Sequence, residues 1–230
     1  MMRVVERFAL GLIVVLLTCG SGQATVSVSP VIIEAAQVRA GQAFAIICQN
    51  WGEQSIELQL SLALFDQDET GGVVFLEDGE AVRRATEMLA LNHEVLILEP
   101  KGQDIVQVEL TRDDFDHLYA VLFVKPTQGG VPTRFAVLFL LSTSEDRANV
   151  AVSSWMQQGE ALAFTVHNSG LRHGLWEGEL HLFDAFNQLG ERRKVTSGVV
   201  LAGRSRGVQV PLPRWVHRVE LITDHSVQSP

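Results

Sequence analysis

The stretch RFAVLFLL, residues 134–141, sets seven consecutive apolar residues behind a single arginine. The run is too short to cross a membrane, and its Phe, Val and Leu content favours a β-strand over a helix. Because successive side chains of a strand point to opposite faces, one face carries Phe135, Val137, Phe139 and Leu141, and the other carries Ala136, Leu138 and Leu140. A β-sandwich buries one face of each strand, so the second apolar face needs cover from elsewhere in the chain or from a partner.

The sequence on either side of this stretch predicts further strands. Residues 56–64 alternate Ile and Leu with Glu, Gln, Ser and Ala, which is typical of a strand with one core face. Residues 25–33 form a strand pattern broken by Pro30, which suits an edge strand. Strands recur about every 8–12 residues with turns between them and no long amphipathic helix, so we predict an all-β fold. Residues 73–91 are ambiguous and favour a short strand and a loose helical turn.

A short polar segment, SEDRA at residues 144–148, separates two regions with the same strand pattern. Linkers between domains are usually polar and exposed. We therefore expect one β-sandwich over residues 25–143, a linker over 144–148, a second β-sandwich over 149–224 and a tail over 225–230.

The N-terminus has the features of an export signal. Arg3 and Arg7 precede an apolar run over residues 8–17, and a group of small residues ends at Ala24. This pattern predicts a signal peptide over residues 1–24 and an exported protein of the periplasm or cell surface. Two alternatives stay open: an uncleaved leader in the membrane, or a lipoprotein anchored through Cys19. Cleavage after Ala24 leaves Cys48 as the one cysteine, which we expect to be a buried small hydrophobe.

Charge and motifs disfavour several classes of function. The formal net charge of −9 argues against nucleic acid and anionic membrane surfaces as main partners, so we expect a membrane partner only if Cys19 is lipidated. The sequence has no GxSxG elbow, glycine-rich phosphate loop or CxxC pair. We therefore expect no enzyme activity and no cofactor.

Two sets of potential metal ligands lack the spacing of known metal motifs. They are His167, His173 and His181, near a predicted strand–turn–strand, and Asp113, Asp114 and Asp116 in a polar corner. We expect solvated side chains at both places and predict no metal site. The four tryptophans are spread along the chain, so a platform for stacking sugars is not indicated.

Several segments, taken in order, resemble a known family. VSVSPVII (residues 26–33), GQAFAIICQN (41–50), LYAVLFVKP (118–126) and RFAVLFLLS (134–142) are similar to the first domain of PapD-like periplasmic pilus chaperones and related cell-surface proteins. Residues 162–190 and 199–213 are similar to the second domain of those relatives. The resemblance implies two tandem immunoglobulin-like β-sandwiches. It also implies that residues 134–141 can add themselves as a strand to a partner's incomplete sheet.

One departure from this family shapes the functional hypothesis. Usher-type pilus chaperones grip a subunit's C-terminal carboxylate with an Arg in the first strand and a Lys at the end of the last strand of the first domain. Here neither residues 26–33 nor residues 141–146 contain a basic residue. The main hypothesis is therefore an exported, non-enzymatic protein-binding or scaffold protein of the cell envelope. The alternatives are a periplasmic chaperone for assembly of pilus-like surface fibres, and a cell-wall or carbohydrate-binding module.

Residues 134–141 contain the predicted binding site. We expect Ala136, Leu138 and Leu140, with Arg134 at their start, to form an apolar edge strand that binds other envelope or surface proteins. In the alternative reading, the neighbouring domain or the acidic loop 66–72 covers this face.

Overall fold

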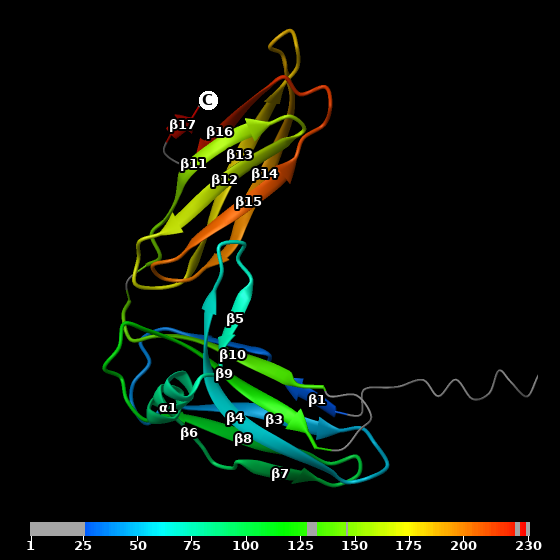
Figure 1. Cartoon of the computed structure of the whole chain (residues 1–230), viewed down its shortest axis with the longest axis vertical. Helices are drawn as coiled ribbons and strands as arrows, with labels where there is room; N and C mark the ends of the chain where they lie inside the picture. The colour runs from blue at the N-terminus through cyan, green and yellow to red at the C-terminus, as the bar shows by residue number, and fades with distance from the viewer. Residues whose placement is uncertain (1–25, 128–132, 146, 224–225, 229–230) are drawn as a thin grey trace, which may run out of the picture.

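The computed structural model describes residues 26–127, 133–145, 147–223 and 226–228 of the chain. Almost all of its regular structure is β-strand, arranged as two sandwiches that follow one another along the chain (Figure 1). The predicted all-β architecture is therefore confirmed. The predicted leader over residues 1–24, with Cys19, lies outside the described residues. Within the described residues, no helix is both long and apolar enough to span a bilayer.

The first sandwich consists of two sheets. One, which we call the β3 sheet, has the strand order β1 (Val26–Ser29), β3 (Ala43–Asn50), β8 (Gln103–Leu110) and β6 (Leu89–Leu91). The other, the β10 sheet, has the order β2 (Ile32–Ala35), β10 (Phe135–Ser142), β9 (His117–Pro126), β4 (Ile56–Gln67) and β5 (Val73–Leu76). Strand β7 (Val95–Leu98) pairs with the start of β4, and β5 pairs with its end.

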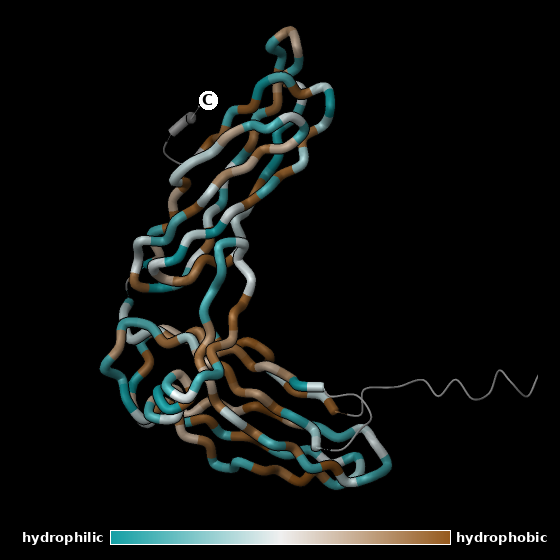
Figure 2. The backbone as a smooth tube through the Cα atoms, in the orientation of Figure 1, coloured by the Kyte–Doolittle hydropathy of each residue, from teal (hydrophilic) through white to brown (hydrophobic). Residues whose placement is uncertain are grey.

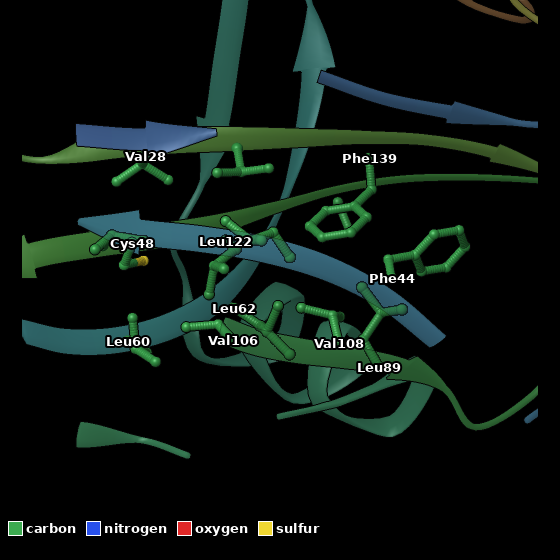
Figure 3. Packing of buried hydrophobic residues seen from close by; sticks show 14 of the residues in the cluster. Val28, Phe44, Cys48, Leu60, Leu62, Leu89, Val106, Val108, Leu122 and Phe139 are labelled. Atoms are coloured by element: carbon green, nitrogen blue, oxygen red, sulfur yellow. The ribbon is translucent and has the colours of Figure 1, made fainter. Parts of the chain in front are cut away.

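The core of the first sandwich fixes which face of β10 points inward. Val137, Phe139 and Leu141 are fully buried, and Phe135 packs against the same cluster. Figure 3 shows Phe139 among these side chains, and its ring meets Phe44 edge to face with ring centroids 5.9 Å apart. Burying each such side chain contributes about 1.5–3 kcal/mol. The predicted alternation along residues 135–141 is confirmed, and so is the predicted burial of Cys48.

At Pro30 the chain crosses from one sheet to the other. Strand β1 pairs antiparallel with β3, whereas β2 pairs parallel with β10, and the Ser29–Pro30 peptide bond between them is cis. Both strands are terminal in their sheets, as the proline predicts, since proline has no N–H group to donate to a ladder and therefore favours edge strands. One side of the first sandwich therefore presents the outer edges of β1 and β2.

The ambiguous segment 73–91 contains β5, helix α1 (Gly79–Met88) and β6. Asp78 caps the helix, because its side chain accepts hydrogen bonds from the N–H groups of Glu80 and Ala81. Ala81, Ala85 and Met88 are buried. The helix lies against β4 and β6 and closes one end of the first sandwich (Figure 1).

The second sandwich also has two sheets. One contains β11 (Val150–Gln158), β12 (Ala161–Asn168) and β15 (Ser205–Pro211). The other contains β14 (Leu189–Val200), β13 (Gly174–Phe183), β16 (Arg218–Thr223) and β17 (Ser226–Gln228). Between the two sheets, the rings of Phe164 and Trp176 meet edge to face with centroids 5.3 Å apart. Residues 143–149 connect β10 to β11, in the region where the sequence predicts a linker.

Candidate functional site

The outer face of the β10 sheet, opposite its core, carries a line of apolar side chains. Leu138 lies in register with Ile32 of β2, so both side chains share this face. We call Ile32, Ala136, Leu138 and Leu140 the outer strip. Ile32 is 56% exposed, Ala136 and Leu138 are half-buried, and Leu140 is only 7% exposed. The strip therefore has an open end at Ile32 and Ala136 and a closed end at Leu140.

The closed end lies at the junction with the second sandwich. Leu140 belongs to an apolar cluster that contains Tyr119 of β9 and also Leu201 and Ala202 of the second sandwich. Ala136 and Leu138 are only partly buried where they pack against this cluster. The alternative in which the neighbouring domain covers the second face of β10 therefore holds at Leu140 and does not hold at the open end.

The predicted edge position of β10 requires a correction. Strand β10 pairs with β9 along its whole length and with β2 over Leu138–Leu141, where the Leu138 N–H donates to the Val31 carbonyl at 2.9 Å. Within the described residues, β10 is an edge only over its first three positions, residues 135–137. Main-chain groups alternate in direction along a strand, so the Ala136 N–H and C=O point to the same side as those of Leu138, beyond the start of β2. The pairing with β2 joins segments about a hundred positions apart, which local sequence patterns do not predict.

Arg134 precedes β10 and binds groups of its own sandwich. Its Nη1 lies 2.6 Å from Glu77 Oε2 and its Nη2 lies 3.0 Å from Glu77 Oε1. Its guanidinium also stacks 3.7 Å above the centre of the Phe123 ring and 5.7 Å from that of Phe75, a favourable cation–π geometry. The hydrogen bonds from Arg134 hold the pKa of Glu77 below its ordinary value. Arg134 therefore fastens the segment after β5 over the outer face of the sheet.

The hairpin of β4 and β5 reaches the base of the second sandwich (Figure 1). The Gln67 side chain accepts a hydrogen bond from the Leu201 N–H at 3.2 Å and donates one to the Val199 carbonyl at 2.8 Å. Beside it, Arg204 Nε donates to Asp66 Oδ1 at 2.7 Å. The acidic loop predicted at residues 66–72 thus contributes to the contact between the sandwiches.

A second polar contact joins the sandwiches at Glu34, next to Leu140 in the register of β2 and β10. Glu34 Oε1 lies 2.9 Å from Arg172 Nη2 and 2.9 Å from His173 Nε2. Burial acts to raise the pKa of Glu34, but the contacts with His173 and Arg172 outweigh it and hold this pKa below its ordinary value. Burial also lowers the pKa of His173, and this effect outweighs the opposing influence of Glu34.

Tyr119 completes the junction from within the β10 sheet. Its phenol oxygen accepts a hydrogen bond from the Ala202 N–H at 3.0 Å. Its ring stacks on the His117 ring with centroids 5.0 Å apart, and it meets the His173 ring edge to face with centroids 6.1 Å apart. Burial raises the pKa of the Tyr119 hydroxyl. The closed end of the outer strip is therefore fixed by both apolar and polar contacts.

The overall architecture can be compared with that of known proteins. No protein family model matches the chain, and no curated protein matches it in sequence. Solved structures do match it: the class 5 fimbriae chaperone CfaA has a TM-score of 0.57 at 11% identity, covering 89% of this chain and 98% of its own. The chain has the fold of PapD-like fimbrial chaperones. The YadV chaperone supports the same fold, with a TM-score of 0.51 at 10% identity, covering 90% of this chain and 98% of its own.

A third match comes from a chaperone–tip adhesin complex of CFA/I fimbriae biogenesis. It has a TM-score of 0.56 at 11% identity and covers 90% of this chain and 98% of the matched chain. The PapD-like fold confirms the predicted pair of tandem immunoglobulin-like β-sandwiches. It also confirms the fold implied by the family resemblance of the sequence.

Within this PapD-like fold, the three histidines considered as metal ligands do not meet. His167 Nδ1 lies 3.0 Å from Ser205 Oγ, His173 lies at Glu34, and His181 Nε2 lies 2.6 Å from Glu179 Oε1. In the polar corner, Asp114 binds Arg112. Among the described residues, no group of three or more His, Cys, Asp or Glu side chains has an arrangement that could hold a metal ion.

The sequence analysis missed the residues that join the two sandwiches. Glu34, Asp66 and Tyr119 of the first sandwich bind residues between 172 and 204 of the second. The one available signal was chemical: Glu34 and Asp66 stand within or beside strongly apolar strands, where an unpaired carboxylate is unfavourable. That signal indicates that a partner exists, but it does not identify Arg172 or Arg204.

Proposed function

We propose that this protein is an exported, non-enzymatic binder of surface-fibre subunits, which it holds along the open end of the outer strip. The observation that carries the proposal is the position of Ala136. There the side of β10 that faces away from β9 has no strand partner among the described residues, and it lies beside the apolar side chains of Ile32 and Leu138. The PapD-like fold supports the choice of partner, since one of the similar structures is a chaperone–tip adhesin complex.

The proposed binding mode is addition of a strand. An extended segment of the partner pairs with the main chain around Ala136, which sets direction and register. The same segment covers Ile32 and Leu138, and burial of each contributes on the order of 1.5–3 kcal/mol. Part of this gain offsets the loss of freedom on association, so the partner needs further contacts with the outer face.

The four residues that the sequence assigned to the site take two roles in this proposal. Ala136 and Leu138 contact the partner directly. Leu140 and Arg134 do not contact the partner and instead hold the site in shape. Leu140 lies in the junction cluster, and Arg134 is bound to Glu77 and to the Phe123 ring. Arg134 holds the wall of the strip, formed by Phe75 and Phe123, in place for the incoming strand.

A carboxylate grip is not part of the proposed mechanism. The charged residue of β2 is acidic, Glu34, and Arg172 and His173 already bind it. In this proposal the protein therefore recognises an internal strand of the partner and its apolar side chains. Binding does not require contact with the partner's C-terminal carboxylate. Both a chaperone, which releases its subunit, and a permanent scaffold of the envelope use such a surface. They differ in the lifetime of the complex.

The test is co-purification of the exported protein from its native envelope, with the captured proteins identified by mass spectrometry. In the test variant, Ile32→Lys and Leu138→Lys place charges at the open end, where they oppose strand pairing. The matched control is Ile97→Lys, which changes an apolar residue of β7 that is 62% exposed. We expect the test variant to stay folded and lose its fibre subunit, and the control to retain it.

The outcome that contradicts the proposal is capture of the same subunit by the Ile32→Lys, Leu138→Lys variant. Retention of isolated cell wall by the wild type, with no captured protein, would instead favour the carbohydrate-binding alternative. Dissociation of the captured subunit within one assembly cycle favours a chaperone, and a complex that persists favours a scaffold.

Export is the second part of the proposal. The charged start, apolar run and small residues before Thr25 support removal of residues 1–24. N-terminal sequencing of the exported protein should begin at Thr25. Lipid attached to Cys19 would establish the lipoprotein alternative, and a chain that starts at Met1 in the cytosol would refute export.

A further inference from the structure

The tip of the β4–β5 hairpin, residues 66–72, touches the second sandwich at a place away from the chain connection. We call residues 66–72 the strap. Residues 143–149 connect the sandwiches along one side of the junction, and the strap reaches the second sandwich on the other side (Figure 1). A short polar connection by itself leaves two domains free to change their relative orientation. A second contact at a separate place restricts that motion, so the contacts of the strap decide how rigid the molecule is.

The strap has a fixed conformation of its own. Asp68 Oδ1 accepts hydrogen bonds from the N–H groups of Thr70 and Gly72, both at 2.8 Å, and from the Thr70 hydroxyl at 2.7 Å. The main chain closes the same turn, because the Asp68 N–H donates to the Gly72 carbonyl at 2.9 Å. Gly71 has a φ of 88°, which glycine adopts without strain. All these bonds lie within the strap, so its shape does not depend on the second sandwich.

Hydrogen bonds attach the strap to the second sandwich. The Gly207 N–H of β15 donates to the Glu69 carbonyl at 2.7 Å. Within the described residues, β15 is the last strand of its sheet, so the strap adds one main-chain bond at that edge. The Gln67 side chain binds the Val199 carbonyl and the Leu201 N–H beside it. Figure 2 draws the end of the hairpin in teal and white and its base on β5 in brown, so the strap itself is polar.

The Arg206 side chain of β15 interlocks with the strap. It fills the space in front of two glycines, Gly71 of the strap and Gly198 of β14. A Cβ at Gly71 would overlap the Arg206 Nε atom, and a Cβ at Gly198 would lie 2.6 Å from Arg206 Nη1. Arg206 Nη1 also donates to the Val199 carbonyl at 3.3 Å. The guanidinium therefore lies against the backbone of both sandwiches, and a side chain at either glycine would displace it.

We propose that the strap is a locking device that fixes the angle between the two sandwiches, and that Arg206 is the positioning residue that holds it. The apolar junction cluster around Leu140 keeps the sandwiches together, but hydrophobic attraction is non-directional. The strap adds hydrogen bonds, whose strength depends on direction, and an interlocked side chain. Without it, residues 143–149 act as a hinge. A partner held at the open end of the outer strip then meets the second sandwich in one orientation. This consequence rests on the proposed function, whereas the lock itself does not.

The test is NMR relaxation and residual dipolar couplings of the exported protein, measured without a partner. We expect the two sandwiches of the wild type to share one rotational correlation time and one alignment tensor. Gly71→Ala and Gly198→Ala, each displacing Arg206, should give the sandwiches separate values. The matched controls are Gly41→Ala and Gly203→Ala, which should behave as the wild type. Their φ angles of 86° and 70° match the 88° and 68° of the test positions, and among the described residues no atom lies within 4 Å of the added Cβ.

Arg206→Ala tests the same lock without backbone strain, and it too should give the sandwiches separate correlation times. The proposal is overturned if the wild type already reorients as two independent bodies, or if Arg206→Ala keeps the common alignment tensor. Loss of the common tensor in the control glycine variants as well would assign the effect to backbone strain and overturn the role of Arg206. Because no partner is present, a protein that captures no subunit can still pass this test, so the lock and the proposed function fail separately.

Discussion

The two ends of the outer strip share one strand and one face but differ in burial. Leu140 is 7% exposed and lies among Tyr119, Leu201 and Ala202, whereas Leu138 and Ala136, on the same face of β10, are half-buried. The alternation of the strand makes both ends apolar. The second sandwich covers one of them, and within the described residues nothing comparable covers the other. The outer face of β10 is therefore apolar for two separate reasons. At Leu140 it contacts the second sandwich, and at Ala136 and Leu138, in our proposal, it contacts a partner.

The largest expected effect comes from a charge at the closed end. Leu140→Lys places an ammonium group in the buried junction cluster, beside a Glu34 that Arg172 and His173 already bind, and should lower the free energy of unfolding by about 3 kcal/mol or more. Urea denaturation followed by circular dichroism measures the loss. Leu138→Lys is the matched control, two residues away on the same face. Equal losses in the two variants would remove the distinction between the ends.

Loss of the Tyr119 hydroxyl should have the next largest effect. Tyr119→Phe keeps the ring but leaves the Ala202 N–H without its acceptor. An unsatisfied buried donor costs about 1–3 kcal/mol. The thermal unfolding midpoint should fall accordingly, and small-angle scattering should detect a wider range of angles between the sandwiches. An unchanged midpoint and an unchanged scattering profile would show that apolar contacts alone hold the closed end.

Much of this comparison was predictable from the sequence, and the limit of prediction has a physical reason. Alternation at residues 135–141 and the break at Pro30 depend on local geometry, so both were predicted. The parallel pairing of β2 with β10 and the contact of Glu34 with Arg172 join distant segments. Local sequence patterns do not show which distant segment pairs with a given strand. For that reason the sequence predicted β10 as an edge strand along its whole length.

Acid should weaken the closed end through His173. Burial holds the pKa of His173 below the ordinary 6.5, so below that pH the unfolded chain binds a proton that the folded chain does not. Stability therefore decreases as the pH falls below about 6.5. The low pKa of Glu34 adds a further loss in stronger acid, as the pH falls below the ordinary 4.5 towards this pKa. His173→Gln should flatten the decrease between pH 7 and 5.

The control for this pH dependence is His93→Gln, which changes a histidine at an exposed position of the first sandwich. This variant should keep the wild-type slope of stability against pH. If His173→Gln keeps that slope as well, groups elsewhere in the chain cause the acid sensitivity.

The smallest effect is expected at the open end in the absence of a partner. Leu138→Lys should change the free energy of unfolding by no more than about 0.5 kcal/mol, as most surface substitutions do. Cys48 provides a sensitive probe, since burial raises its pKa to about 11 and a thiol reagent reaches it only when the first sandwich opens. Its labelling rate in Leu138→Lys should stay within about twofold of the wild type. Much faster labelling would show that Leu138 belongs to the stabilising core.

Amide hydrogen exchange of β10, measured with and without the captured subunit, tests the central claim most directly. The Ala136 N–H lies beyond the start of β2, whereas the Leu140 N–H lies within the pairing of β10 and β2. We predict that Ala136 exchanges quickly in the protein alone and slowly in the complex, and that Leu140 exchanges slowly in both. Fast exchange of Ala136 in the complex, with protection appearing elsewhere, would contradict binding at the open end of the outer strip.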